Sequence, residues 1–587
     1  MALQLSIIFL PLLMGFSLFT PLARVKNFLT VVYVSVLVLL SSLLFFITPY
    51  HFSFSFNSLF HTLFIGADFV LLFYFLGQGI LQRSKNVTLL ALLQLFLFLI
   101  VLFLPQGESA SDIVVDRLTL YMYLIVNIVG GSIIVYALKY IDAESFSQRK
   151  KDLFIAMLFL FLGVMNFIVS FNNLELFFLL FETTTLFSYL LIRYRSDEIS
   201  VVNALRALWM NQIGGVSILI ALLYSLFAYK TLYLDLLLQH SGTSLMFVFL
   251  FLALAAFVKG ASLPFESWLL GAMVAPTPVS AILHSATMVK IAPFLMLKLS
   301  AGFDAFFSLV FVLLGSFVFF AASFMALGKD SFKEILGLST IALLALMMAL
   351  AALGTPEAIE AALYLMVFHA LSKALLFLQA GILERELGLK YVKDIDGLMN
   401  YSPRLAFVII LGFASLTLPP FGAFAGKFLA IESLASVLKT QVLYTFALVF
   451  VALGSVLLTL LYFKVLSKVF AQDLSIKREK LYLSPYYTLP SNFLLCLLGL
   501  GVLLTASNDA FSSFEILFTF LVFVSFPLLI SFFLFKKAQR VGEYNCGEKG
   551  SAEISMYYFT LKKSWITLFH FGVIIGFVLA FVGILLC

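Results

Sequence analysis

The sequence predicts an all-α polytopic membrane protein, and three observations support this fold class: the composition, the apolar runs and the placement of the basic residues. Of the 587 residues, 63% are hydrophobic and only 11% are charged. A soluble domain carries about 25% charged residues, and disordered chains and nucleic-acid-binding surfaces also need more charge. The composition excludes these classes, so we expect a lipid bilayer around the chain and no nucleic-acid partner.

The apolar runs predict about 18 transmembrane helices, because a helix needs roughly 20 apolar residues to cross a hydrocarbon core. Runs between charged or Pro/Gly-rich breaks lie at 2–20, 28–48, 60–81, 88–104, 116–138, 153–170, 173–193, 206–229, 246–270, 276–299, 305–327, 335–353, 360–383, 404–432, 441–468, 491–506, 517–535 and 564–586. The first run has no basic region before it and no small-residue cleavage site, so we expect it to be retained.

The basic residues support this count and predict an orientation. Of the 36 Lys and Arg residues, 28 lie in loops after odd-numbered runs and four lie in loops after even-numbered runs. Because Lys and Arg collect in cytoplasmic loops, we expect the odd-numbered loops to face the cytoplasm. Both termini would then lie on the non-cytoplasmic side of the cell (inner) membrane.

Four lysines remain inside apolar runs: Lys259, Lys290, Lys373 and Lys427. Each charge at the centre of a bilayer costs about 2.5–3.5 kcal/mol on insertion scales, so four of them indicate a function. Glu182 is the matching acid, in the middle of the run LFFLLFETTTLFSYLLI. It is either a protonatable relay group or half of a structural ion pair between two helices.

Two histidines, His284 and His369, also lie inside apolar runs. His369 and Lys373 are four residues apart and share a helix face. His284 and Lys290 are six residues apart, so a water molecule or Thr287 would have to bridge them. Neutral histidine passes protons near physiological pH, and the nearby lysines favour this role over packing alone.

Two of the runs contain helix breakers next to a buried lysine. Gly260 and Pro264 follow Lys259 in KGASLPFESW, and Pro419 and Pro420 precede the last lysine in LTLPPFGAFAGK. Proline removes a backbone hydrogen bond that hydrocarbon cannot replace, so such breaks persist only against protein or a wet cavity. The alternative is a kink used for packing.

The two interrupted helices predict an internal repeat. Each is the fourth of a block of five runs, and an odd repeat length turns the second copy upside down. We therefore expect two inverted five-helix repeats, at about 153–299 and 305–468. They lie in a core at 111–470, between N-terminal helices at 1–110 and C-terminal helices at 471–587 with short cytoplasmic links.

Several stretches resemble the antiporter-like, proton-translocating subunits of respiratory complex I, Mrp cation/proton antiporters and membrane-bound energy-converting hydrogenases. These stretches are LPFESWLLGAMVAPTPVSAILHSATMVK (263–290), FHALSKALLFLQAG (368–381), LPPFGAFAGK (418–427) and the segment around Glu182. The resemblance covers roughly residues 110–470. It implies a 14-helix core that conducts protons along a buried axis, with four spans in addition to that core.

By position, the resemblance gives each buried residue a role. Glu182 resembles the key glutamate and Lys259 its partner on the first broken helix. His284 and Lys290 resemble the relay on the next helix, and Lys427 the lysine on the second broken helix; His369 and Lys373 resemble the connecting pair. The chain departs from the family pattern at Leu365, where a second histidine is frequent, at Leu270–Gly271, and at Gln212–Gly215, where many members have Arg–Val–Gly–Asp.

Three functions follow as hypotheses. The first is a proton-translocating subunit of a redox-driven complex of the NADH-quinone oxidoreductase or hydrogenase type. The second is a Na⁺(K⁺)/H⁺ antiporter subunit of an Mrp-like assembly, and the third is a non-conducting membrane scaffold. The three cysteines form no CxxC pair, so we expect no iron–sulfur or closed zinc site in this chain. We expect no catalytic residue or cofactor here, and redox cofactors in partner membrane subunits.

Overall fold

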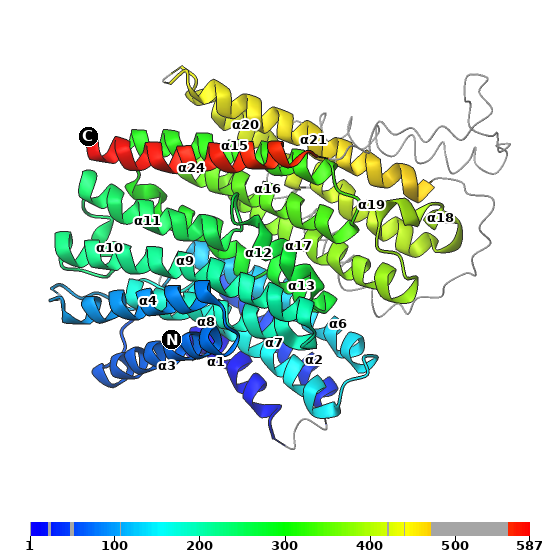
Figure 1. Cartoon of the computed structure of the whole chain (residues 1–587), viewed down its shortest axis with the longest axis horizontal. Helices are drawn as coiled ribbons and strands as arrows, with labels where there is room; N and C mark the ends of the chain where they lie inside the picture. The colour runs from blue at the N-terminus through cyan, green and yellow to red at the C-terminus, as the bar shows by residue number, and fades with distance from the viewer. Residues whose placement is uncertain are drawn as a thin grey trace.

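The computed structural model describes residues 2–20, 25–46, 52–105, 107–418, 422–439, 441–470 and 561–586 as a bundle of long helices that run side by side (Figure 1). Fourteen of its helical segments are long and apolar enough to cross a membrane, and two shorter apolar helices accompany them. The all-α polytopic prediction is confirmed. The predicted spans 491–506 and 517–535 lie outside the described residues.

The N-terminal half follows the predicted order of runs. Its helices are α1 (Ala2–Ser17), α2 (Lys26–Phe46), α3 (Ser58–Leu81), α4 (Lys85–Phe103), α5 (Arg117–Leu124), α6 (Gly131–Asp142), α7 (Gln148–Ile168), α8 (Leu174–Ile192), α9 (Glu198–Tyr229), α10 (Leu234–Leu237), α11 (Thr243–Lys259), α12 (Glu266–Gly271), α13 (Thr277–Ser285) and α14 (Ile291–Leu299). Between α5 and α6 the run winds as a π-helix over Ile125–Gly130. Strands β1 (Phe52–Phe54) and β2 (Ile113–Val115) form one antiparallel ladder.

The C-terminal half contains α15 (Ala305–Leu327), α16 (Phe332–Leu353), α17 (Pro356–Glu386), α18 (Leu398–Tyr401), α19 (Pro403–Thr417), α20 (Gly422–Val437), α21 (Tyr444–Phe470) and α24 (Lys563–Leu586). The last of these, coloured red in Figure 1, lies along α15 and contacts α11. Where it approaches the first helix break, the imidazole of His570 lies 2.9 Å from the carboxylate of Glu266.

The first predicted helix break is present. The helix ends at Lys259, the chain turns through Gly260 and Pro264, and α12 begins at Glu266. The second run is also interrupted, between the end of α19 at Thr417 and the start of α20 at Gly422. Pro419 and Pro420 lie outside the described residues. The inverted relation between the two repeats and the three-part division of the chain stay predictions.

The span predicted at 276–299 is present as Thr277–Gly302, but it contains a break that was not predicted. The run 276–299 is broken between α13 and α14, where Thr287 adopts φ −122° and ψ −108° before a 3₁₀ turn over Met288–Lys290. No proline or glycine lies at this point, so the break could not be predicted from helix-breaking residues. The Thr287 hydroxyl replaces part of the lost backbone bonding, because it donates to the Ile282 carbonyl at 2.6 Å.

The described loops lie at two ends of the bundle. Those after odd-numbered runs lie at one end, and those after even-numbered runs lie at the other. The end of α24 marked C and the short α10 lie at the left of Figure 1, and α18 lies at the right. Polar contacts join loops of the same parity. After odd-numbered runs these are Lys26–Asp152, Arg195–Glu144, Lys333–Glu384 and Lys468–Asp396; after even-numbered runs they are Asn173–Asp112, Asn172–Asp235 and Lys298–Asp116. Consecutive runs up to residue 470 therefore alternate in direction, and the cytoplasmic assignment of the odd-numbered loops stays a prediction.

The ion pair between Asp116 and Lys298 predicts an acid-dependent loss of stability. Burial alone would raise the pKa of Asp116, but Lys298 at 2.6 Å and the hydrogen bonds from Thr119 hold that pKa below its ordinary value. A depressed folded-state pKa gives stability that is present above the unfolded pKa, about 4, and is lost as the pH falls through the folded pKa.

We expect Asp116→Asn to lower stability by about 1 kcal/mol or less near neutral pH, since asparagine keeps the cap of α5 but loses the charge. Thermal unfolding of both proteins in detergent between about pH 7 and pH 3 would measure this. The difference in melting temperature should shrink towards the acid end. A difference that stays constant with pH would contradict the assignment.

Candidate functional site

The predicted path residues lie in the interior of the bundle, on helices from both halves of the core. Glu182 is on α8, Lys259 ends α11, His284 is on α13, Lys290 closes the 3₁₀ turn before α14, His369 and Lys373 are on α17, and Lys427 is on α20. Six of these side chains are completely buried, and Lys427 is 5% exposed. Ionisable groups at such depth must be bonded to protein or to enclosed water.

Lys259 and Glu182 meet on α8, but they bind different atoms. The Lys259 amine donates to the Phe181 carbonyl at 3.1 Å and to the Thr185 hydroxyl at 3.0 Å, and lies 3.7 Å from the centroid of the Phe181 ring. The Glu182 carboxylate accepts a 2.7 Å hydrogen bond from the Gln94 amide of α4. The structure places the predicted pair side by side without an ion pair of 4 Å or less.

Lys290 and His369 form a direct contact between two helices. The amine of Lys290 lies 2.9 Å from Nδ1 of His369. Thr287 does not bridge His284 to Lys290, because its hydroxyl is bonded to the Ile282 carbonyl. The lysine on the 3₁₀ turn is therefore connected to the histidine of α17, which sequence spacing alone did not indicate.

His284 lies among these groups without a hydrogen bond of its own. Its ring is 4.6 Å from the ring of Phe377, centroid to centroid. Neither ring nitrogen has a hydrogen-bond partner among the described residues, and Nε2 of His369 also has none. Buried nitrogens of this kind are positions for enclosed water or for a transient partner.

Lys373 turns away from His369 towards α16. Its amine donates to the Leu336 carbonyl at 3.0 Å and to the Ser339 hydroxyl. The same carbonyl also accepts bonds from the hydroxyls of Ser339 and Thr340, three and four residues later. The predicted pair shares a helix face, but its two members bond to different helices.

Lys259 is bound on α8 in the same way as Lys373 is bound on α16. The Phe181 carbonyl accepts bonds from Thr184 and Thr185, three and four residues later, and from Lys259. In each case a buried amine binds one backbone carbonyl and one hydroxyl of a helix. Helices α8 and α16 are also the second helices of the two predicted repeats.

Lys427 lies apart from the other lysines. It lines a groove of about 310 Å³ between α20 and α21, together with Thr417, Ser455 and Thr459. The hydroxyls of these three residues donate to carbonyls of their own helices. The groove gives the last lysine of the predicted axis access to space outside the tightly packed interior.

Comparison with known proteins identifies the family of the segment that holds these residues. Residues 171–457 match the family model described as the transmembrane part of NADH:quinone oxidoreductase and Mrp antiporter proteins. This segment belongs to that antiporter-like family. All seven predicted path residues lie inside it, so the predicted family resemblance is confirmed.

The curated relatives are longer than this chain. Na⁺/H⁺ antiporter subunit A1 of Staphylococcus aureus strain JH9 is 30% identical over 346 residues, which cover 55% of this chain and 43% of that protein. The same protein from strain Newman gives the same values. The chain therefore spans less than half the length of these relatives.

A solved structure shares the fold over most of its length. A chain of the membrane-bound sulfane sulfur reductase, described as an archaeal respiratory membrane complex, superposes with a TM-score of 0.62 at 16% identity. The match covers 85% of this chain and 94% of that one. At this identity the likeness shows the fold.

Sequence reasoning missed three polar residues around Glu182. Gln94 and Gln212 are fully buried amides that bond to each other, and Gln94 also holds the glutamate. Asp68 on α3 is buried as well. A search for acids and amides inside apolar runs, like the search made for lysines, would have found them.

Two of the departures from the family pattern, at Leu365 and Gly215, have structural explanations. Leu365 packs on the backbone of Gly426, which precedes Lys427, so an apolar contact occupies the place of the second histidine. At Gly215, where many members have aspartate, the Glu182 carboxylate and the Gln94 amide fill the space of a side chain. The missing carboxyl group at 215 leaves room for the Gln94–Glu182 hydrogen bond.

We therefore expect Gly215→Ala to disrupt the Glu182 contact. Its Cβ would overlap both Glu182 and Gln94, and overpacking of this kind costs about 1–3 kcal/mol. Gly77→Ala on α3 is the matched control, because a Cβ there meets nothing within 4 Å. Melting temperatures in detergent would compare the two variants. Equal stability for both would contradict the close approach at Gly215.

Proposed function

We propose that this chain is a proton-translocating membrane subunit of a multisubunit complex and that protons move along the buried axis from Glu182 to Lys427. The intermediate groups are Lys259, His284, Lys290, His369 and Lys373. Membership of residues 171–457 in the antiporter-like family supports this proposal, as does the burial of every member of the axis. Ionisable residues inside membrane helices are by default candidates for an ion or proton path.

The observation that carries the proposal is the kind of partner that each buried amine has. Lys259 and Lys373 bond to a neutral carbonyl and a hydroxyl, and Lys290 bonds to an imidazole. By contrast, buried Lys26 and Lys464 near the helix ends pair with aspartates. A lysine fixed to a carboxylate holds its proton, whereas one held by neutral groups gives it up more readily. This difference supports a relay over a scaffold of structural ion pairs.

The chemistry of the axis favours protons over metal cations within this chain. Hard cations such as Na⁺ need several oxygen ligands, and lysine ammonium groups repel them. Among the described residues no three His, Cys, Asp or Glu side chains gather in a metal-binding arrangement. The proposed substrate of the path is therefore H⁺.

The energy source lies in partner subunits in this proposal. The relative named as antiporter subunit A1 supports assembly with other subunits. We propose redox cofactors in those partners, so that their reaction acts on the axis electrostatically, and we place the chain in the cell membrane with both termini outside the cytoplasm. Any oxidoreductase activity would then belong to the complex.

A second candidate is a subunit of a Na⁺/H⁺ antiporter, favoured by the 30% identity with antiporter subunit A1. Dependence of proton flux on Na⁺ in vesicles without a redox substrate would favour this function. Flux that requires electron transfer and ignores Na⁺ would favour the redox-driven complex. The axis itself has the same role in both.

We expect Glu182→Gln and Lys259→Ala each to reduce proton flux by about 100-fold, the scale for loss of a positioned proton-transfer group. Flux would be measured with a pH-sensitive dye in proteoliposomes that contain the native complex with the variant chain. Complex assembly, followed by gel filtration, should be unchanged. Normal flux in both variants would overturn the proposed path.

Lys427→Ala tests the far end of the axis. We expect normal assembly and a similar loss of flux, because the proton would have no acceptor at the groove. Lys230→Ala is the control, since this lysine is exposed at the end of α9 and is not one of the axis residues. If flux is unchanged in Lys427→Ala, this residue is not part of the path.

A further inference from the structure

Helices α3 and α8 carry ionisable side chains with the same spacing. His61 and Asp68 on α3 are seven residues apart, and so are Glu175 and Glu182 on α8. Seven residues make two helical turns, about 10.5 Å, so each pair lies on one helix face. The two helices contact each other, and Asp68 lies close enough to Glu175 and Glu182 for their charges to interact.

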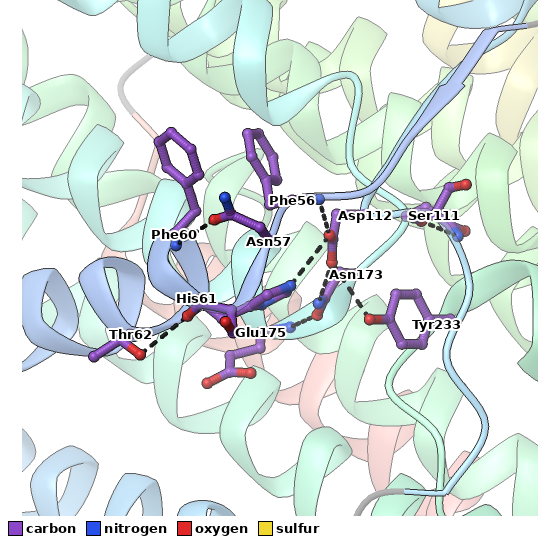
Figure 2. A network of polar contacts seen from close by, with 12 residues as sticks. Phe56, Asn57, Phe60, His61, Thr62, Ser111, Asp112, Asn173, Glu175 and Tyr233 are labelled. Carbon is purple, nitrogen blue, oxygen red and sulfur yellow. Dashed lines mark hydrogen bonds and ion pairs between the residues drawn. The ribbon is translucent and has the colours of Figure 1, made fainter.

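His61, near the start of α3, joins a polar network around Asp112 (Figure 2). Asp112 accepts 2.8 Å hydrogen bonds from the Phe56 backbone N–H and the Asn173 amide, and lies 3.3 Å from Nε2 of His61. The Asp112 side chain is 2% exposed, whereas that of His61 is 34% exposed. His61 therefore connects a buried carboxylate to solvent.

Several oxygens of the inner carboxyl groups lack hydrogen-bond donors among the described residues. Among the described residues, both oxygens of Asp68, Oε1 of Glu175 and Oε2 of Glu182 have no partner. Asp68 is 1% exposed and Glu182 is fully buried. Buried carboxylates are costly without donors, so protons or enclosed water must satisfy these oxygens.

The same carboxyl groups do not form a cation site. A metal ion would draw at least three ligands together, and among the described parts of the chain no such group of His, Cys, Asp and Glu exists. The carboxyl groups are instead spaced singly along two helices, as separate protonatable sites. Protons can pass between such sites through water, whereas a cation would need several ligands at each site.

We propose that His61, Glu175 and Asp68 form a branch that carries protons between the Asp112 surface network and Glu182. This inference rests on the proposed function. It adds that the axis opens to solvent at the end of the bundle formed by loops after even-numbered runs. A proton enters or leaves at His61, passes through enclosed water to the carboxyl groups of Glu175 and Asp68, and reaches or leaves Oε2 of Glu182. No bond other than those to the moving proton changes.

The test is Asp68→Asn in the native complex, in proteoliposomes with an imposed pH gradient. We expect about a 100-fold loss of proton flux with normal assembly, and recovery of most of the flux in Asp68→Glu, which restores the carboxyl group. Asp304→Asn is the matched control, because Asp304 lies at the same end, and asparagine keeps its role as the cap of α15.

Infrared spectroscopy gives a second readout that a structural role would not change. The C=O stretch of a protonated, buried carboxyl group should disappear in Asp68→Asn and persist in Asp304→Asn. If Asp68→Asn does not assemble, Glu175→Gln replaces it with the same expected loss of flux.

Comparison with Glu182→Gln separates the two proposals. Loss of flux in Glu182→Gln with normal flux in Asp68→Asn would overturn the branch and keep the axis. Normal flux in both would overturn the proposed function itself. Loss in Asp68→Asn that Asp68→Glu does not restore would also overturn the branch, because it would assign Asp68 a packing role.

Discussion

The requirement that dominates this structure is that amines buried among apolar helices must find hydrogen-bond acceptors. Hydrocarbon offers none, and the backbone of an intact helix has already used its carbonyls. The protein solves this with carbonyls that accept more than one bond, such as that of Phe181, which receives a lysine and two threonine hydroxyls. The carbonyl of Leu336 is used in the same way. Side-chain hydroxyls thus fix both amines without supplying a counter-charge.

Most of the fold could be predicted from the sequence because membrane-spanning helices leave a strong signal. Apolar runs of about 20 residues and the loop distribution of basic residues predicted the order of the described helices. The break at Gly260 was predicted because glycine and proline are visible in the sequence. The break at Thr287 was not, because no proline or glycine lies there. The predicted span 276–299 is present, and the Thr287 hydroxyl bonds to the Ile282 carbonyl at its break.

The burial of the site could be predicted, but its pairing could not. Charge inside an apolar run identified the buried lysines, yet the contact of Lys290 with His369 joins residues 79 positions apart. Spacing on α17 favoured a pair of His369 with Lys373, whereas packing turns that lysine to α16. Gln94 was missed because an amide carries no charge, although it is the group that holds Glu182. Pairing depends on which helices touch, which the sequence of one helix does not contain.

In the proposed function, the separate bonding of Lys259 and Glu182 supports proton transfer between them. Lys259 binds Phe181 and Thr185 of α8, on either side of Glu182 in the sequence, while the carboxylate is held by Gln94. A carboxylate partner would fix the charge of the lysine, whereas Phe181 and Thr185 offer only neutral acceptors. The absence of a side chain at Gly215 leaves the carboxylate room for its bond to Gln94. A fixed ion pair between these two groups would favour a purely structural role, so the separate hydrogen bonds of the amine and the carboxylate support the proposed relay.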